Sequence, residues 1–218
     1  MQASSLKQQA WQAIRQHEVE LSDLALRLRD NPELGYQEVT ASAWLAEYLA
    51  QQGFQVTKPF GGLATAFNAC QTAGAGPTIA YLAEYDALPD VGHGCGHNLI
   101  AAACVAAGVG VAAVLGQVGG RVCVMGTPAE EFADAEEGKL KLLRADAFEG
   151  VDVALSMHPH TDNQIMRSDV GFIGFELVFH GHPAHAAADP WNGANALDGL
   201  ILTYNNIARD INAMPQLG

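Results

Sequence analysis

Side chains that could bind a metal follow three short apolar runs of the chain, at residues 78–85, 121–125 and 151–157. The candidates are Cys95 and His97 in GHGCGHN, the pair Glu130 and Glu131 in GTPAEE, and His158 with His160 in MHPH. Thiolate, imidazole and carboxylate groups together are typical ligands of zinc and related metals, whereas calcium and magnesium prefer oxygen alone. The residue types therefore predict a site for zinc or a related metal, if the three clusters meet in space.

The elements that would position these clusters are predicted by the apolar pattern. Short apolar runs bounded by Gly or Pro are typical of buried strands, and they occur at residues 54–57, 63–69, 78–85, 121–125 and 151–157. Helical patterns end before Asn31-Pro32 and cover residues 38–52, 99–115 and 137–147. This alternation predicts an α/β fold with a largely parallel central sheet flanked by helices. In such a sheet ligands bind outside the carboxyl ends of the strands, so the three clusters can converge.

The pattern changes beyond Asp162, which indicates a second module. Residues 171–180 alternate like a strand with one exposed face, and residues 195–211 form an amphipathic helical pattern after the loop GHPAHAAADPWNG. One strand and one helix are too little to close a core alone. We therefore predict a catalytic metal-binding domain over residues 1–167 and the start of a second domain over residues 168–218.

Composition excludes several classes of protein. The 218 residues are 49% hydrophobic, which excludes a disordered chain, and the formal net charge of −13 argues against nucleic acid or an anionic membrane as a partner. Residues 99–116 are uncharged over the length of a membrane helix, but their small side chains favour a buried helix of a soluble domain. Four cysteines do not make a disulfide framework, so we expect Cys70, Cys104 and Cys123 to be free core residues in a reducing cytoplasm.

Each cluster also has a simpler interpretation. The pair Glu130-Glu131 could be a solvated helix start, and His158 a core residue at a strand end. Cys95 could instead be a nucleophile activated by His93 or His97, but that interpretation leaves both glutamates and His158 without a role. Residues 59–120 contain no Lys or Arg, so we expect no cation of the protein itself to compete for the site. Adjacent glutamates suit a division of labour, in which one holds a metal and the other takes up a proton.

Four motifs in order resemble a known family. AEYDALPDVGHGCGHNLIAAA, GTPAEE, MHP and GHPAHAAADPWNGANALD resemble the amidohydrolase branch of the aminoacylase and carboxypeptidase G metallopeptidases. The forms EYDALP, CGHN and NPELGYQE are most similar to the group that contains an aminobenzoyl-glutamate hydrolase subunit and β-alanyl-lysine dipeptidase. The resemblance implies a zinc-peptidase-like catalytic domain followed by a smaller α+β lid or dimerisation domain.

The resemblance also implies roles for individual residues. Two divalent ions, Zn or Mn with Co or Ni as further options, would be held by Cys95, His97, Glu131 and His158, with His160 as the second choice for the last ligand. Glu130 would be the general base and Asp86 an orienting residue. His185 of the lid would hold the substrate carbonyl or carboxylate, in relatives often across a dimer. The implied activity is hydrolysis of the amide bond of N-acyl amino acids or dipeptides by a cytoplasmic homodimer.

One departure from the family concerns length. Full-length relatives continue through the lid and return to the catalytic domain with a final His ligand, whereas no His follows His185 and this sequence stops at Gly218. We therefore expect the N-terminal part of the enzyme, with self-association through residues 171–180. The alternative is a catalytically incomplete fragment or pseudo-enzyme, which folds and binds metal or a partner without turnover.

Overall fold

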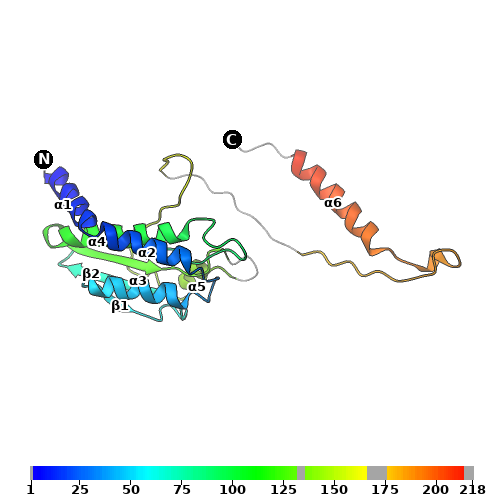
Figure 1. Cartoon of the computed structure of the whole chain (residues 1–218), viewed down its shortest axis with the longest axis horizontal. Coiled ribbons are helices and arrows are strands. Elements are labelled where there is room, and N and C mark those ends of the chain that lie inside the picture. Colours follow the sequence, from blue (N-terminus) through cyan, green and yellow to red (C-terminus); the bar gives the residue numbers. More distant parts are fainter. Residues whose placement is uncertain (1, 132–135, 166–175, 214–218) are drawn as a thin grey trace. The chain divides into compact units, whose positions relative to one another are not determined.

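The computed structural model describes residues 2–131, 136–165 and 176–213, with backbone alone for residues 2–4 and 209–213. The chain divides into two compact units, Met1–Met166 and Arg167–Gly218, and each is described by itself. The first unit holds a five-stranded sheet with helices, and the second holds one long helix (Figure 1).

The sheet of the first unit has the strand order β1-β2-β4-β3-β5. Its strands are β1 Gln55–Thr57, β2 Phe67–Ala73, β3 Thr78–Ala83, β4 Gly120–Gly126 and β5 Val153–Leu155. β3 pairs in parallel with both β4 and β5, whereas β2 pairs antiparallel with β1 and β4. Only β2 among these strands therefore runs against the others. The predicted α/β fold with a central sheet is confirmed, and the sheet is mostly but not entirely parallel.

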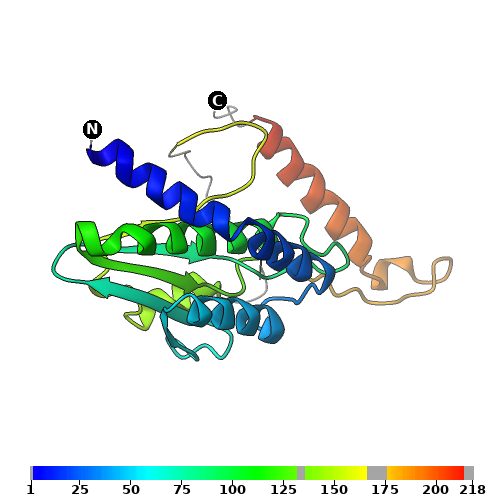
Figure 2. The same cartoon turned by 60° about the vertical axis from the view of Figure 1, so that its left-hand side comes forward.

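Helices cover this sheet in two layers on one face. The helices of the first unit are α1 Gln2–Gln16, α2 Glu18–Asp30, α3 Val39–Gln51, α4 His97–Val118 and α5 Gly138–Arg144. α3 packs against β1 and β2, and α4 packs against β3 and β4. α1 and α2 then pack on the outer side of α4 (Figure 2). The second face of the sheet is covered by the segment around residues 147–151.

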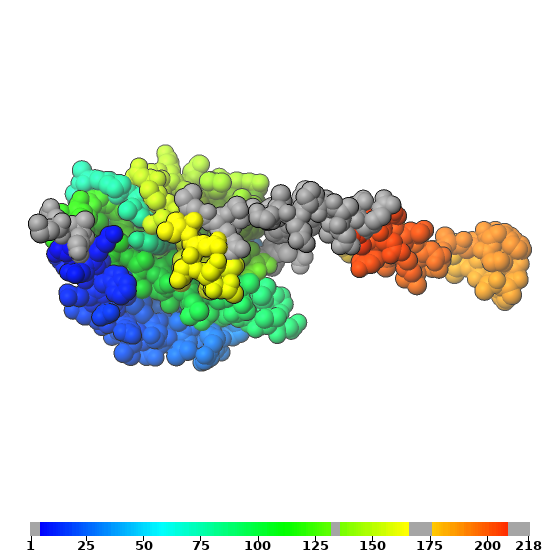
Figure 3. Space-filling model, turned by 90° about the horizontal axis from the view of Figure 1, so that it is seen from above, coloured from blue at the N-terminus to red at the C-terminus, as the bar shows by residue number. Residues whose placement is uncertain are grey.

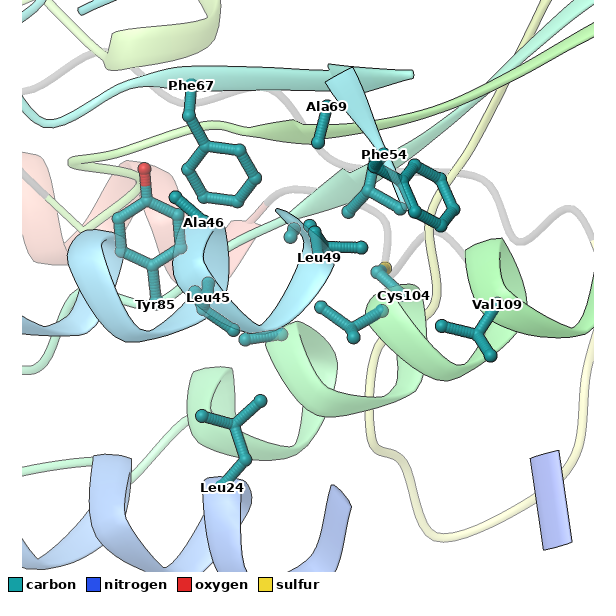
Figure 4. Close-up of a cluster of buried hydrophobic side chains, with 14 of the residues drawn as sticks. Leu24, Leu45, Ala46, Leu49, Phe54, Phe67, Ala69, Tyr85, Cys104 and Val109 are labelled. Carbon is teal, nitrogen blue, oxygen red and sulfur yellow. The ribbon is translucent and has the colours of Figure 1, made fainter. Parts of the chain in front are cut away.

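Alternation along β4 divides the core between the two faces. Val122 and Val124 point toward α3 and α4 and join the main core, which includes Leu45, Leu49 and Phe67 (Figure 4). Cys123 and Met125 point to the other face and pack in a smaller cluster. Both faces are apolar, because a strand in the middle of a layered sheet is buried on each side.

α4 is the core helix that begins at the candidate metal site. Among the described residues it is the one helix long and apolar enough to cross a membrane, by length and composition alone. It lies against β3, β4, α1 and α2, as a helix in a protein core does. A Cβ on Gly108 would lie 2.4 Å from Val124 Cγ2, so glycine at this position lets the helix approach the sheet. This is the role that the small side chains of residues 99–116 predicted.

The helices and strands predicted for the first unit are present in the structure, but their ends are shifted. The helices predicted over residues 38–52, 99–115 and 137–147 are α3, α4 and α5. The bounds predicted for the strand over residues 63–69 are wrong, because β2 begins at Phe67 and continues to Ala73. Gly74 and Gly76 mark the true end of β2, and both have the positive φ of a turn.

The prediction of free core cysteines is wrong for two of them. Cys70 on β2 lies directly opposite Cys123 on β4, and the two form a disulfide across 53 residues of sequence. Cys104 is free and buried, as expected. The bond depends on the antiparallel register of β2 and β4, which the spacing of the cysteines does not reveal.

The second unit is described from residue 176. It contains α6 Ala196–Ala213, which matches the helix predicted over residues 195–211, and the short helix η1 Pro190–Asn192. Residues 176–180 form no strand in the structure, and residues 171–175 of the predicted strand lie outside the described residues. A backbone bridge between His182 and Ala194 closes the loop that carries His185.

The contact of α4 with the sheet can be tested by a matched pair of glycines. Gly108→Ala should lower the free energy of unfolding by about 1–3 kcal/mol, because its methyl group would overlap Val124. Gly116→Ala on the same helix meets nothing within 4 Å and should raise it by up to about 1 kcal/mol through helix propensity. Urea denaturation measures both variants, and equal stability of the two would contradict this packing.

Candidate metal centre

The site lies where β3 and β4 end beside each other. The two strands are parallel with Ala83 paired to Gly126, so the loops that follow them start at the same edge. The Thr127 amide continues the pairing by donating to the carbonyl oxygen of Ala83 at 2.8 Å. The β3 loop carries Glu84 and Asp86, and the β4 loop carries Glu130 and Glu131. Carboxylates from two distant motifs are therefore neighbours, as the strand-end argument predicts.

His97 is the first residue of α4 and is oriented by Asp86. Gly96 precedes it with φ +81, a left-handed conformation that lets the chain turn from Cys95 into the helix. His97 is 1% exposed, and its Nδ1 lies 2.9 Å from Asp86 Oδ1 and 3.0 Å from the Asp86 carbonyl oxygen. Both partners are acceptors, so Nδ1 carries the proton. An imidazole held in this way presents Nε2 as a metal ligand.

Three carboxylates surround that Nε2 atom. It lies 3.5 Å from Glu84 Oε2, 3.7 Å from Glu130 Oε2 and 3.7 Å from Glu131 Oε1. Within the described part of the chain, the buried atoms Nε2 of His97 and Oε1 of Glu131 have no hydrogen-bond partner. Ligand atoms of His97, Glu130 and Glu131 lie within 4.8 Å of one another, which suits one cation between them. Orphaned buried polar atoms are costly, and a bound metal would satisfy them.

Cys95 lies at the edge of the same group. A hydrogen bond with Glu131 is the largest cause that raises the pKa of the Cys95 thiol, to about 11, followed by burial and by the charges of nearby carboxylates. A thiol with a raised pKa is unsuited to be a nucleophile, which argues against the alternative role for Cys95. A metal ion would reverse this effect, since coordinated thiols lose their proton.

Asp86 holds the two loops together. Its Oδ1 accepts a hydrogen bond from Nδ1 of His97, and its Oδ2 accepts a hydrogen bond of 2.9 Å from the backbone amide of Glu131. Burial acts to raise the pKa of Asp86, but the hydrogen bonds from His97 and the backbone outweigh it and lower that pKa. The carboxylate is therefore charged and contacts both His97 and the β4 loop.

Two residues of the site were missed by the sequence analysis. Glu84 is 5% exposed, and its Oε1 forms a 2.8 Å ion pair with Lys139 of α5. Lys139 Nζ also lies 3.9 Å from Glu130 Oε1, so the expectation that no cation of the protein would enter the site is wrong. Glu84 could have been found as a polar residue directly after a buried strand. Lys139 could not, because it is 55 residues away along the chain (139 − 84) on a separate helix.

The remaining predicted residues lie outside this group. His158 and His160 are exposed in the surface segment 156–165, drawn in yellow-green and yellow in Figure 3. Pro159 packs beside Gly96, and His158 lines the same groove as Cys95. His160 faces Asp162 at 2.7 Å. His185 belongs to the second unit and is exposed there.

Comparison with known proteins finds relatives that are named as a dipeptidase and as a hydrolase subunit. The chain is 38% identical over 216 residues to the Xaa-Arg dipeptidase of Mus musculus, covering 93% of this chain and 49% of the relative. It is 35% identical over 201 residues to a p-aminobenzoyl-glutamate hydrolase subunit of Escherichia coli, covering 83% of this chain and 41% of the relative. The chain thus spans about half the length of the curated relatives it matches. No family model matches it.

Solved structures agree with the sequence relatives. A Bacillus subtilis protein described as a dinuclear metal-binding peptidase of the M20 family is similar with a TM-score of 0.57 and 28% identity. The match covers 68% of this chain and 44% of that protein. An aminobenzoyl-glutamate utilization protein from Klebsiella pneumoniae shares the fold, with a TM-score of 0.52, 20% identity, and coverage of 67% and 45%. The chain is therefore similar in sequence to a dipeptidase and a hydrolase subunit over about half of their length, and similar in fold to a metal-binding peptidase of the M20 family.

Proposed function

We propose that this chain carries the metal-binding site of a hydrolase that cleaves the amide bond of dipeptides or N-acyl amino acids. The observation that carries the proposal is the buried Nε2 of His97, which has no hydrogen-bond partner among the described residues and faces carboxylate oxygens of Glu130 and Glu131. The relatives that are named as a dipeptidase and as an aminobenzoyl-glutamate hydrolase support the class of substrate.

The donor set fits divalent metals of the zinc group. Cys95, His97 and Glu131 would hold the metal, with His158 supplied by the neighbouring segment and His160 as the second choice. We propose two ions, as in the family, with zinc or manganese ahead of cobalt or nickel. A bound divalent metal polarises a carbonyl group and makes a water molecule more acidic. Mixed sulfur, nitrogen and oxygen ligands favour this group over magnesium or calcium.

Glu130 is the proposed general base. Its side chain is 34% exposed, so it borders both the buried His97 and the solvent from which substrate and water arrive. Burial is the largest cause that raises the pKa of Glu130, and the charge of Lys139 opposes it. A carboxylate with a raised pKa accepts a proton more readily. Glu130 would take the proton of the attacking water and deliver it to the leaving amine.

His185 is the proposed contact with the substrate carbonyl or carboxylate. Its Nδ1 accepts hydrogen bonds from the amides of Ala187 and Ala188 at 3.2 and 3.1 Å. The proton of the neutral imidazole is therefore on Nε2, which is left to donate to an oxygen of the substrate. This local geometry supports a role in stabilising an oxyanion. A homodimer and a cytoplasmic location complete the proposal by resemblance.

A second candidate function is metal binding without turnover. The two candidates share the metal site and differ only in whether substrate is hydrolysed. An assay that measures bound metal and product in the same preparation separates them.

The role of Glu130 can be tested by Glu130→Gln. The variant should keep its metal content while the hydrolysis of dipeptides with a C-terminal Arg, or of N-acyl amino acids, falls at least about a hundredfold. Gln preserves the shape of the side chain but cannot accept the proton. Elemental analysis and a rate assay with added Zn²⁺ or Mn²⁺ give both values.

Glu149→Gln is the matched control, because Glu149 is exposed and outside the site. It should keep both metal and rate. If Glu130→Gln retained the wild-type rate, Glu130 would not be the base. If the wild-type chain bound metal without measurable hydrolysis, the second candidate function would be supported.

Metal binding should be linked to pH through Cys95. Because carboxylates and burial raise the pKa of its thiol to about 11, the metal-free thiol is protonated near neutral pH and must lose that proton to coordinate. Zn²⁺ affinity should therefore rise with pH. Calorimetric titrations in buffers of different ionisation enthalpy should show that Cys95→Ala releases about one proton fewer than the wild type. Equal proton release would show that Cys95 is not a ligand.

A further inference from the structure

The segment 31–38, with the sequence NPELGYQE, contacts both loops of the metal site although it carries none of the proposed ligands. The carbonyl oxygen of Glu33 accepts a 2.9 Å hydrogen bond from the amide of Ala87, which directly follows Asp86. Glu38 Oε1 accepts a 2.8 Å hydrogen bond from the amide of Ala129, which directly precedes Glu130. The Tyr36 hydroxyl donates to the carbonyl oxygen of Glu136, beyond the same loop. One segment thus joins the β3 loop to the β4 loop.

The contact at Ala129 is the most informative of these. Ala129 has φ +57, in the left-handed region that side chains with a Cβ disfavour by about 1–2 kcal/mol. It is fully buried and comes directly before Glu130 and Glu131. A residue held in this conformation needs an interaction that stabilises it, because the chain could otherwise relax and reorient both glutamates.

Glu38 supplies that interaction at a cost of its own. The side chain is 0% exposed, and burial is the largest cause that raises the pKa of its carboxyl group, with hydrogen bonds from Ala129 and Thr65 opposing the rise. Burying a carboxylate is unfavourable unless hydrogen bonds satisfy it. The 2.8 Å hydrogen bond from the Ala129 amide to Oε1 offsets part of the cost of burying Glu38.

A role in capping α3 does not account for Glu38. Glu38 occupies the N-cap position of α3, but its side chain makes no capping hydrogen bond. The carboxylate of Glu33 does so instead, with its two oxygens 3.0 and 2.8 Å from the amides of Thr40 and Ala41. Because Glu33 satisfies the helix end, the carboxylate of Glu38 is turned inward to the β4 loop.

We propose that Glu38 is a positioning residue of the metal site, which fixes the left-handed Ala129 and so aims Glu130 and Glu131 toward His97. The effect of Glu38 on metal binding rests on the proposed function. The hydrogen bond between Glu38 and Ala129 can be measured without metal. This role requires that the side chain of residue 38 offers a hydrogen-bond acceptor to the Ala129 amide, as Oε1 of Glu38 does. Glutamine keeps this acceptor, whereas methionine has a similar size and shape but no oxygen.

Amide hydrogen exchange of the metal-free protein tests the contact. In Glu38→Met the amide of Ala129 should exchange at least about tenfold faster than in the wild type, since it loses its acceptor. In Glu38→Gln it should stay protected. The Thr127 amide, which is bonded to Ala83, is the internal reference and should stay protected in both variants, which also shows that they fold. Unchanged exchange of Ala129 in Glu38→Met would overturn the inference.

Titration with Co²⁺ tests the consequence for the site. Glu38→Met should bind Co²⁺ about 10–100-fold more weakly, as expected for loss of an outer partner of a ligand, whereas Glu38→Gln should stay within about threefold of the wild type. The visible absorption of bound Co²⁺ reports the ligand geometry and should change only in Glu38→Met. Glycine adopts a positive φ without strain, so Ala129→Gly should reduce the loss caused by Glu38→Met.

The two proposals fail in distinguishable ways. If the wild type bound no Co²⁺ while Ala129 protection depended on Glu38, the proposed metal function would fall and the contact would stand. If the wild type bound Co²⁺ and Glu38→Met bound it equally well with the same spectrum, the positioning role would be overturned. A loss in Glu38→Gln as large as in Glu38→Met would also contradict it, because the amide oxygen keeps the acceptor.

Discussion

Asp86 lies buried between the loops that follow β3 and β4, and each of its carboxylate oxygens accepts a hydrogen bond from a different side. Oδ1 orients His97 at the start of α4, and Oδ2 holds the backbone of Glu131. The parallel pairing of β3 with β4 brings the loops to the same edge, and Asp86 then fixes their separation. Without this carboxylate, the imidazole and the glutamates would be near one another but not aligned.

Concentrated negative charge is the second constraint on the site. Glu84, Asp86, Glu130 and Glu131 all lie within the space around His97, and Lys139 neutralises only part of their charge. Carboxylates this close repel one another in a buried setting. A divalent cation relieves that repulsion and satisfies the orphaned atoms of His97 and Glu131 at once. The local arrangement of charge therefore favours a bound cation.

The sequence predicted those features of the site that depend on residues close together along the chain. The placement of candidate ligands at the ends of β3 and β4 and the apolar helix after GHGCGHN follow from residue type and position beside buried runs, whereas the role of Asp86 was implied only by the resemblance. The sequence did not predict Lys139, the Cys70–Cys123 disulfide or the link from Glu38 to Ala129, which spans 91 residues. These depend on sheet register and on how loops pack, and no local pattern encodes either. The shift of β2 to residues 67–73 has the same cause, because pairing with β4 sets its length.

The positive φ values show where the loops of the first unit store strain. Among the described residues, Tyr36, Asp90, Ala129 and Asp146 adopt this conformation without being glycine. Three of the four lie in the segments that surround the site: the segment 31–38, the β3 loop and the β4 loop. Strained backbone persists only where its surroundings hold it, and here buried hydrogen bonds do so at Ala129. In the role proposed for Glu38, a side chain that is not itself a candidate ligand aligns Glu130 and Glu131 through the backbone of Ala129. A motif search that keeps only the candidate ligands omits such a residue.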